Sequence, residues 1–430
     1  MRARFISLGC KVNQYETQAL EGLFARHGFF AETDGEADLV LINSCTVTSL
    51  ADRKTRQMVR RLRRELPNAV LVLTGCMPQT SPDDAAALLE ANIITGTKDR
   101  SQLVALVLDY FKSRQRRVDI ASYTPDEPFE PLNAEKFDDS FQRAYLKIQD
   151  GCDRFCSYCI IPYARGGVRS RPLNQIALET QRLADAGYHE IVLTGINISR
   201  YGADSGASLP EAVQSAAAAH GNFRLRLGSV EPDLLSEADW WALSQIPALC
   251  PHFHIPLQSG CDATLRRMHR RYTAEEFLGT VERIRELFPN PSITTDIIVG
   301  FPGETVEEFA ETCRTVEQIG LLRAHVFEYS PRAGTPAAAM AEQIAPPLKK
   351  ERARKLSELC AASGAQFART QIGQKARVLL EATGGGYTDN YLYVDVPDRA
   401  GVLIGDFINV LITASDSAAC TGVLTSRDYR

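Results

Sequence analysis

Short apolar runs alternate with longer amphipathic stretches over the first hundred residues of the chain. The apolar runs predict strands near 3–8, 38–43, 69–75 and 92–96. Apolar residues that recur every three or four positions predict helices near 14–28 and 50–66. Alternation of this kind is typical of a parallel sheet with helical crossovers, so we expect an α/β domain here.

A second and larger alternation follows a break in the pattern. Residues 119–143 are acidic, contain three prolines and show no period, so we expect a linker. Six strands are then predicted by AYLKIQ, HEIVLTG, FRLRLGS, HFHIPLQ, SITTDIIVG and RAHVFEYS, with helices near 171–187, 209–219, 235–246, 273–287, 304–319 and 346–368. Six such units predict a partial or complete β/α barrel, whose active site lies at the carboxyl ends of the strands.

The pattern changes again near residue 370. Short runs rich in β-branched and aromatic residues, namely QKARVLLEA, NYLYVDVP, GDFINVLIT and ACTGVLTS, are separated by Gly and Asp turns, and no long helix fits. We therefore expect a small all-β barrel of about sixty residues. The predicted domains are 1–118, 144–369 and 370–430, with 119–143 as the linker.

Composition narrows the class of protein. The chain has 430 residues, 44% hydrophobic and 23% charged, as in an ordinary globular protein. No apolar run approaches a membrane span, and the N-terminus lacks a signal-peptide stretch, so we expect no membrane association and a cytoplasmic location. The formal net charge of −5 argues against a globally basic nucleic-acid binder but allows a local basic surface.

Three predicted strands end on a cysteine. ARFISLGC ends at Cys10, ADLVLINSC at Cys45 and LVLTGC at Cys76. Ligands gather outside the carboxyl ends of the strands in parallel sheets. We therefore expect these three ends to meet at a shared site, although a core position is common for any single cysteine.

A second group of cysteines follows the first strand of the predicted barrel. Cys152, Cys156 and Cys159 have C-x3-C-x2-C spacing, which is compact enough to hold one face of an iron–sulfur cluster. A zinc site is the alternative, but it requires a fourth close ligand, and the nearest histidine, His189, lies a whole β/α unit away. The other cysteines are interpreted mostly as core residues: Cys250, Cys261, Cys313, Cys360 and Cys420.

The cysteine loop resembles the radical S-adenosylmethionine superfamily. The resemblance implies that three thiolates leave one iron of a 4Fe–4S cluster open to S-adenosylmethionine, from which a 5′-deoxyadenosyl radical is made. It also implies that Tyr158 lies against the adenine. The ordered segments GCKVNQYET, NSCTVT, TGCMPQ, IIPYARG, LTGINI, GSVEP, HIPLQSG and TTDIIVGFPGET resemble the methylthiotransferase family over nearly the whole chain.

The family resemblance implies further site residues. Cys10, Cys45 and Cys76 would hold a second 4Fe–4S cluster that carries the inserted sulfur. By their positions at the ends of barrel strands, the residues expected to bind the cofactor are Gly195, Asn197, Ser229, Glu231, Gln258 and Gly300. Satisfying local backbone groups is the competing role for Ser229, Glu231 and Gln258. Gly300 is expected to leave room for the adenosine.

Basic clusters indicate a polyanionic partner. Residues 53–65 contain seven Lys or Arg, and RNA contacts are expected from Arg60, Arg61, Arg63 and Arg64. The segments KSRQRR at 112–117 and RRMHRR at 266–271 add two more clusters. Solvated helix faces are the alternative.

Two further residues are candidates for RNA contact. Arg165 follows the cysteine loop and could anchor a phosphate or the carboxylate of the cofactor, although an ordinary surface arginine would look the same in sequence. Tyr391 could stack on a base, and packing within the barrel is the alternative role. The C-terminal module resembles the TRAM domain, an OB-like barrel, but its last sixty residues hold five basic and seven acidic side chains.

These observations lead to one expected architecture and function. We expect a flavodoxin-like α/β domain, a radical S-adenosylmethionine β/α barrel and a TRAM-type barrel. The resemblance implies methylthiolation of adenosine 37 in the tRNA anticodon loop, with an electron donor of flavodoxin or ferredoxin type and a sulfur source as partners. GCKVNQYET favours the branch that acts on N6-threonylcarbamoyladenosine over the isopentenyladenosine and ribosomal-protein aspartate branches. A non-catalytic iron–sulfur or zinc RNA-binding protein stays open as an alternative.

Overall fold

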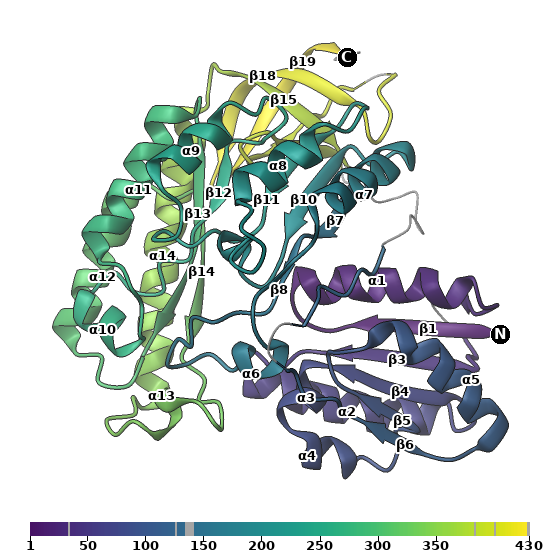
Figure 1. The fold of residues 1–430 in the computed structure, drawn as a ribbon. Helices are drawn as coiled ribbons and strands as arrows, with labels where there is room; N and C mark the ends of the chain where they lie inside the picture. The colour runs from purple at the N-terminus through teal and green to yellow at the C-terminus, as the bar shows by residue number, and fades with distance from the viewer. Residues whose placement is uncertain (33–34, 125–126, 134–141, 382–383, 400, 428–430) are drawn as a thin grey trace.

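The computed structural model of the protein describes residues 1–430 except 33–34, 125–126, 134–141, 382–383, 400 and 428–430. Three parts follow one another along the chain: an N-terminal sheet with its helices, a larger body of strands and helices, and a small barrel near the C-terminus (Figure 1). None of the described helices is both long and apolar enough to cross a membrane.

The N-terminal part is a six-stranded parallel sheet. Its order is β2-β1-β3-β4-β5-β6, with β1 (Arg2–Ser7), β2 (Phe30–Ala31), β3 (Leu39–Ser44), β4 (Val70–Gly75), β5 (Ile93–Thr95) and β6 (Arg117–Asp119). The longer helices are α1 (Lys11–Ala25), α2 (Ser49–Glu65) and α5 (Leu103–Ser113), and the short ones are α3 (Cys76–Thr80) and α4 (Pro82–Ala86). The order 2-1-3-4-5 is that of flavodoxin-like sheets, as predicted, and β6 adds an edge strand.

Residues of β3 alternate between two apolar cores. Leu39 and Leu41 pack in a cluster with side chains of α1 and α5, whereas Val40 and Ile42 pack in a cluster with side chains of α2. Successive strand side chains point to opposite faces, so helices cover both faces of the sheet. Burial on both faces explains why β3 reads as an unbroken apolar run.

The central part is a partial β/α barrel. Six parallel strands are arranged in chain order: β7 (Arg143–Lys147), β10 (Glu190–Thr194), β11 (Arg224–Leu227), β12 (His252–His254), β13 (Ser292–Val299) and β14 (Arg323–Glu328). Single bridges, such as Ser229 with His254, join β11 to β12. Among the described strands β14 does not pair with β7, so the barrel stays open on one side. The predicted six strands and the α/β fold class are confirmed.

Capping boxes set the starts of the outer helices. Their long members are α7 (Leu173–Asp185), α8 (Leu209–Ala217), α9 (Glu237–Ser244), α11 (Ala274–Leu287), α12 (Val306–Ile319) and α14 (Pro346–Thr370). A Ser or Thr at the N-cap exchanges hydrogen bonds with an acidic residue three positions later in α8, α9, α11 and α12. Each N-cap contributes about 1 kcal/mol, which makes the local sequence decide where the helix begins.

The C-terminal part is a closed five-stranded barrel. Its strands are β15 (Lys375–Leu380), β16 (Gly385–Thr388), β17 (Tyr393–Asp395), β18 (Phe407–Asp416) and β19 (Ala419–Arg427), in the order β15-β16-β17-β19-β18. The glycine-rich β16 was not predicted. A Cβ on Gly386 would lie 1.8 Å from the carbonyl oxygen of Leu379, so the close strand approach requires glycine where β propensity is low.

Candidate functional site

The first group of cysteines lies where three neighbouring strands end. β1, β3 and β4 are adjacent in the sheet, and Cys10, Cys45 and Cys76 follow their carboxyl ends. Cys10 immediately precedes α1 and Cys76 begins α3, so both lie at helix N-termini, where the backbone dipole favours a thiolate. We call these three residues the N-terminal triad.

Two glycines allow the chain to pack this closely around the N-terminal triad. Gly9 has φ of 108°, and a Cβ on it would lie 2.5 Å from Cβ of Cys45. Gly75 has φ of 104°, and a Cβ on it would lie 2.5 Å from the carbonyl oxygen of Ser44. Both positions combine a left-handed backbone with a close approach, which only glycine tolerates.

The electrostatics of the N-terminal triad suit a metal cluster. Burial raises the pKa of the Cys45 thiol to about 12, and the neighbouring thiols of Cys76 and Cys10 act in the same direction. Burial also raises the pKa of Cys76, while the guanidinium of Arg165 lowers it. Three crowded thiolates repel one another, so they require a positive centre between them, which an iron–sulfur cluster supplies.

The second group of cysteines lies in the loop between β8 (Gln149–Asp150) and α6 (Ile161–Arg165). We call Cys152, Cys156 and Cys159 the barrel triad. The Cys159 N–H donates to the Cys156 carbonyl at 2.9 Å, which curls the loop. Burial raises the pKa of Cys159 to about 12, with the Cys156 thiol adding to the effect. A guanidinium nitrogen of Arg270 donates to Sγ of Cys156 at 3.4 Å and offers positive charge beside the thiols.

Neither triad has the arrangement of a mononuclear metal site. Zinc requires its ligands about 2.0–2.3 Å from one point. In the part of the chain that the structure describes, no three or more His, Cys, Asp or Glu side chains converge in that way.

Asn197 and Gly195 lie beside the barrel triad. The Asn197 side-chain amide donates to Sγ of Cys152 at 4.0 Å, and its buried Oδ1 has no partner among the described residues. Its backbone N–H donates to Oε1 of Gln149 at 2.7 Å, and a Cβ on Gly195 would lie 2.8 Å from the Gln149 carbonyl oxygen. An unsatisfied buried oxygen is costly, so Asn197 is suited to bind a polar group of a ligand at Cys152.

Glu231 and Tyr158 also lie near the barrel triad. The Glu231 carboxylate accepts a hydrogen bond from Arg270, the same guanidinium that contacts Cys156. The Tyr158 ring packs edge-on against Phe301, with 6.4 Å between ring centroids. Ser229 lies two residues after β11 and has an exposed side chain. The sequence reasoning missed Arg270, because RRMHRR reads as a surface cluster, whereas Arg270 is buried.

Gln258 and Gly300 have backbone roles at the ends of β12 and β13. Gln258 has φ of 61°, and its N–H donates to the Asp296 carbonyl at 2.8 Å, which extends the strand pairing. A Cβ on Gly300 would lie 2.5 Å from Cγ of Lys349. The space expected beside Gly300 for adenosine is therefore occupied by Lys349 of α14.

The prediction of an RNA contact for Arg165 is wrong, because its side chain is fully buried. Its guanidinium pairs with Glu16 of α1 at 2.5 Å and donates to Oδ1 of Asn13 at 2.8 Å. Arg100 and Lys147 also pair with the Glu16 carboxylate, at 2.5 and 2.9 Å. Glu16 thus joins the N-terminal part to the barrel in a buried ion-pair network that the sequence reasoning missed.

Further contacts join the cysteine-bearing edges of the two parts. Arg332, in the loop after β14, donates to Oγ1 of Thr46 at 2.6 Å and to Asp52 at 2.7 Å, just after Cys45. Thr97 donates to the Ala164 carbonyl at 2.6 Å, near the barrel triad. A cavity of about 520 Å³ lies at this junction and is lined by residues of both parts, including Gln79 and Cys152. The carboxyl-terminal edges of the sheet and of the barrel therefore face the same junction.

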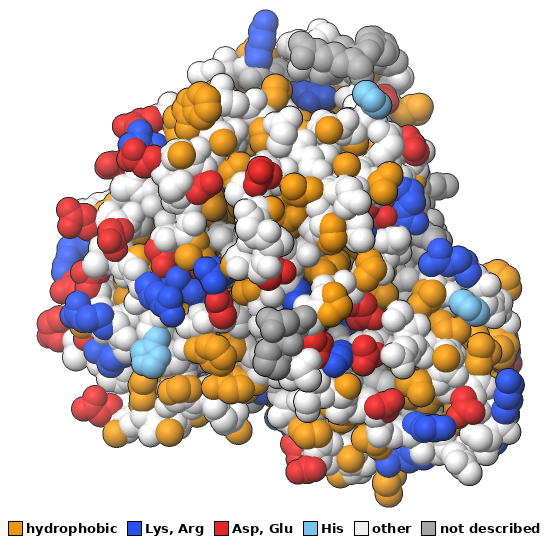
Figure 2. Space-filling model, viewed as in Figure 1, with side chains coloured by type: hydrophobic (Ala, Val, Ile, Leu, Met, Phe, Trp, Pro, Cys, Tyr) orange, Lys and Arg blue, Asp and Glu red, His pale blue; other side chains and the backbone are white. Residues whose placement is uncertain are grey.

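The residues predicted to contact RNA divide into two groups. The guanidinium of Arg63 donates hydrogen bonds to oxygens close to the end of α2, so Arg63 stabilises the helix end and is not available to RNA. Its acceptors are the carbonyls of Leu66, Pro67, Ala69 and Glu90 and the side chain of Asn92. Three other side chains of α2, which we call the α2 arginines, are exposed: Arg60, Arg61 and Arg64. On the face shown in Figure 2, basic and acidic side chains are interspersed over all three parts.

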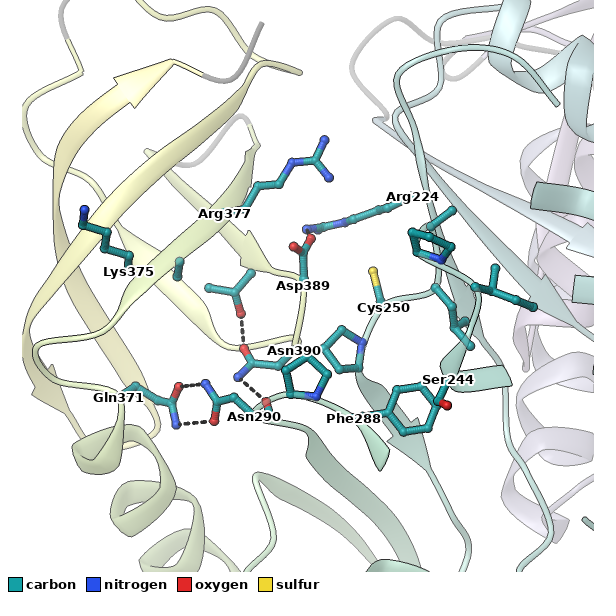
Figure 3. Close-up of a pocket in the computed structure, with 18 of the residues that line it drawn as sticks. Arg224, Ser244, Cys250, Phe288, Asn290, Gln371, Lys375, Arg377, Asp389 and Asn390 are labelled. Atoms are coloured by element: carbon teal, nitrogen blue, oxygen red, sulfur yellow. Dashed lines mark hydrogen bonds and ion pairs between the residues drawn. The ribbon is translucent and has the colours of Figure 1, made fainter. Parts of the chain in front are cut away.

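Tyr391 lies at the seam between the two barrels. Its ring stacks on His252 at 4.4 Å and on Tyr387 at 4.7 Å between centroids, and Arg226 lies 4.6 Å from its centroid. The prediction that Tyr391 stacks on a base is therefore replaced by a packing role. A cavity of about 380 Å³ at this seam is lined by Arg224, Cys250 and Asp389 among others and by no residue of either triad (Figure 3).

Comparisons with known proteins cover nearly the whole chain. Residues 146–316 match the family described as Radical SAM superfamily, and residues 2–96 match Uncharacterized protein family UPF0004. A solved structure of the radical S-adenosylmethionine methyltransferase TsrM from Kitasatospora setae is 14% identical with a TM-score of 0.58, over 92% of this chain and 78% of that one, which is a likeness of fold.

Curated relatives extend the comparison. The threonylcarbamoyladenosine tRNA methylthiotransferase MtaB of Bacillus subtilis is 38% identical over 95% of this chain and 93% of its own length. The protein of the same name from Thermotoga maritima is 35% identical over 99% and 96%. The tRNA-2-methylthio-N(6)-dimethylallyladenosine synthase of Pelotomaculum thermopropionicum is 33% identical over 98% and 97%. Identity at this level over the full length, together with the paired cysteine triads, means that the chain belongs to the radical S-adenosylmethionine methylthiotransferase family.

Proposed function

We propose that the protein transfers a methylthio group to C2 of N6-threonylcarbamoyladenosine at position 37 of tRNA. Family membership implies S-adenosylmethionine and one 4Fe–4S cluster, and the second cluster is part of the proposal. The observation that carries the proposal is the meeting of two cysteine triads at one junction between two parts of the chain. Four relatives that are 34–38% identical are named threonylcarbamoyladenosine tRNA methylthiotransferases, which supports this substrate.

The barrel triad would hold the cluster that binds S-adenosylmethionine. When bound, this pair supplies the radical chemistry that removes hydrogen from an unactivated C–H bond, which no side-chain acid or base achieves. The role of the protein's own residues is to bind and orient the cluster and the cofactor. Asn197 presents its free Oδ1 beside Cys152, and Arg270 links Cys156 to Glu231. Gly195, Tyr158, Ser229 and Gln258 complete the predicted binding edge.

The N-terminal triad would hold the second cluster, from which the sulfur is transferred. The buried network around Glu16 fixes α1, and therefore Cys10, against the barrel. This arrangement keeps both triads near one substrate carbon, which lowers the entropic cost of bringing the reacting groups together. Substrate RNA would present the base by everting it from its loop.

The α2 arginines would attract the tRNA backbone. They lie on the helix that begins four residues after Cys45, so a bound anticodon loop would approach the N-terminal triad. Phosphate neutralisation by surface Arg is the usual source of RNA affinity. The proposal also requires an electron donor of flavodoxin or ferredoxin type, a sulfur source and a cytoplasmic location, where tRNA is present.

Anaerobic reconstitution tests the proposal. The enzyme is expected to bind about eight irons per chain and to release 5′-deoxyadenosine with dithionite. Mass spectrometry of tRNA nucleosides from a deletion strain, with and without the restored gene, is expected to show loss and return of 2-methylthio-N6-threonylcarbamoyladenosine. Loss of the isopentenyl derivative, or of ribosomal aspartate methylthiolation, would assign the chain to another branch. Zinc without 5′-deoxyadenosine release would refute the enzyme.

A further inference from the structure

The inner faces of the barrel strands carry charged and polar side chains. By strand alternation, inward positions include Arg143, Glu190, Arg226, His252, His254 and Asp296, whereas their chain neighbours Ala144, Ile191, Leu225 and Phe253 belong to the apolar core under the helices. A closed β/α barrel normally fills its lumen with bulky aliphatic side chains. The composition of this lumen instead suits a polar ligand.

The charges at the floor of the lumen are already matched. Glu190 accepts hydrogen bonds from three arginines on neighbouring strands, namely Arg143, Arg224 and Arg226. Arg224 also pairs with Asp389 of the C-terminal barrel at 2.8 Å, and these two residues lie next to each other at the seam in Figure 3. The floor is therefore a closed structural layer that has no cation to spare for a ligand.

Higher in the lumen lies one cation, Lys11, to which no described residue is directly bonded. Lys11 is the first residue of α1, directly after Cys10. Its side chain is accessible to solvent and makes no hydrogen bond or ion pair with any described residue. It nevertheless lies within electrostatic range of two arginines, Arg143 and Arg226, and of two carboxylates, Glu190 and Asp296, whose strands enclose the lumen. Of these carboxylates, Glu190 is bound by three arginines, and Asp296 lies 3.3 Å from Nε2 of His254.

The position of Lys11 is fixed by contacts on the following turn of α1. Glu16 pairs with Lys147 at the end of β7, and Tyr15 accepts a hydrogen bond from Arg171 at 3.0 Å. In Figure 1 the first turn of α1 lies beside β7 and β8. An ammonium group held between the N-terminal triad and the lumen, with no direct ion pair to a described residue, is suited to bind an anion of the ligand.

The two possible tRNA substituents differ in whether they carry an anion. A threonylcarbamoyl group ends in a carboxylate, whereas a dimethylallyl group is a hydrocarbon. We propose that Lys11 binds the carboxylate of the N6-threonylcarbamoyl group and is the specificity-determining residue of the site, an inference that rests on the proposed function. A dimethylallyl group would leave the Lys11 ammonium desolvated and without a partner, which lowers the affinity for the dimethylallyl RNA. The same ammonium raises the affinity for the threonylcarbamoyl RNA, so both effects contribute to specificity.

The proposal is tested by removing the negative charge of the RNA carboxylate and, separately, the positive charge of Lys11. Reconstituted enzyme is titrated with an anticodon stem-loop that carries N6-threonylcarbamoyladenosine and with the same RNA as its carboxylate methyl ester. Wild-type enzyme is expected to bind the acid about tenfold more tightly than the ester, since a charge-assisted hydrogen bond contributes about 1.5 kcal/mol. Lys11→Met is expected to bind both equally, whereas Lys11→Arg and the exposed control Lys350→Met are expected to keep the preference. Iron content is measured for each variant.

Three results would overturn this proposal. They are equal binding of acid and ester by wild-type enzyme, a preference that survives Lys11→Met, and an equal loss of affinity for both RNAs in that variant, which would make Lys11 a phosphate contact. Each of these can occur while wild-type enzyme still methylthiolates the threonylcarbamoyl RNA, so they do not touch the proposed function. Methylthiolation of the dimethylallyl RNA alone would refute the proposed function as well.

Discussion

Replacing Arg165 by methionine tests whether the buried ion-pair network holds the two cysteine-bearing parts together. Methionine preserves most of the side-chain volume but removes the guanidinium that Glu16 and Asn13 contact at 2.5 and 2.8 Å. All three side chains are fully buried, so no water replaces the lost partner. We therefore expect this single substitution of a buried residue to lower the free energy of unfolding substantially.

The magnitude follows from the Glu16 carboxyl. Burial raises the pKa of Glu16, but Arg100, Arg165 and Lys147 together lower it from 4.5 to about 2. This difference corresponds to about 3 kcal/mol of stability for all three cations. One cation accounts for about 1 kcal/mol of it. Oδ1 of Asn13 loses its charged donor and keeps only the long contact from Sγ of Cys10 at 3.8 Å, which adds about 1–3 kcal/mol. Arg165→Met should therefore cost about 3 kcal/mol.

Calorimetry of the full-length metal-free chain measures this cost. At pH 7 the midpoint temperature is expected to fall by about 3 °C, because a chain of 430 residues has an unfolding entropy of about 0.9 kcal/mol/K. Arg354→Met, which breaks an exposed pair with Glu358, should change the midpoint by less than about 1 °C. Because the folded-state pKa of Glu16 is depressed, its contribution is present above pH 4.5 and is lost as the pH falls towards 2. The deficit of Arg165→Met should shrink over that window. A deficit no larger than that of the control, or one independent of pH, refutes the reasoning.

Three further predictions concern the clusters and RNA. Cys156→Ala should abolish 5′-deoxyadenosine release and leave about four irons, and Cys45→Ala should keep the release but stop methylthiolation; loss of all iron in either variant contradicts separate sites. Changing the α2 arginines to Gln should reduce the salt slope of tRNA binding by roughly 2, and an unchanged slope places the RNA elsewhere. Gly9→Ala should lose iron only from the N-terminal triad, whereas Gly28→Ala, with φ of 83° and open space around it, should keep both clusters; equal iron content in the two variants contradicts the steric argument.

The long periodic elements were predictable from the chain because their signals are local. The strands that end near Cys10, Cys45 and Cys76 agree with β1, β3 and β4, and all six barrel strands were predicted. The short edge strands β2 and β6 were missed, since two or three residues carry no period. Helix α5 was also missed, because LVALVLDYF is apolar enough to suit a strand or a buried helix.

The site was predictable only where its residues are close in sequence or end similar strands. The cysteines satisfy that condition. Glu16 and Arg165 do not, because they are 149 residues apart and each reads as an ordinary surface charge until the two parts are packed together. Arg63 was assigned to RNA for the same reason, since the carbonyls that it binds come from the loop after α2 and from Glu90. The partners of a buried charge depend on the tertiary structure and cannot be predicted from the local sequence.

The charged inner face of the barrel was predictable from the sequence, because its strands alternate charged and apolar residues although strands of a parallel sheet are normally apolar throughout. Strands of a parallel sheet are normally buried on both faces and read as continuous apolar runs. RAYLK, RLRL and HFH instead alternate charged or aromatic residues with apolar ones, as if one face met water. In this open partial barrel the outer face packs under helices, while the inner face carries charged side chains that pair with one another. Alternation in parallel strands thus indicates a polar inner face, the side of the sheet on which we propose that Lys11 binds the substrate.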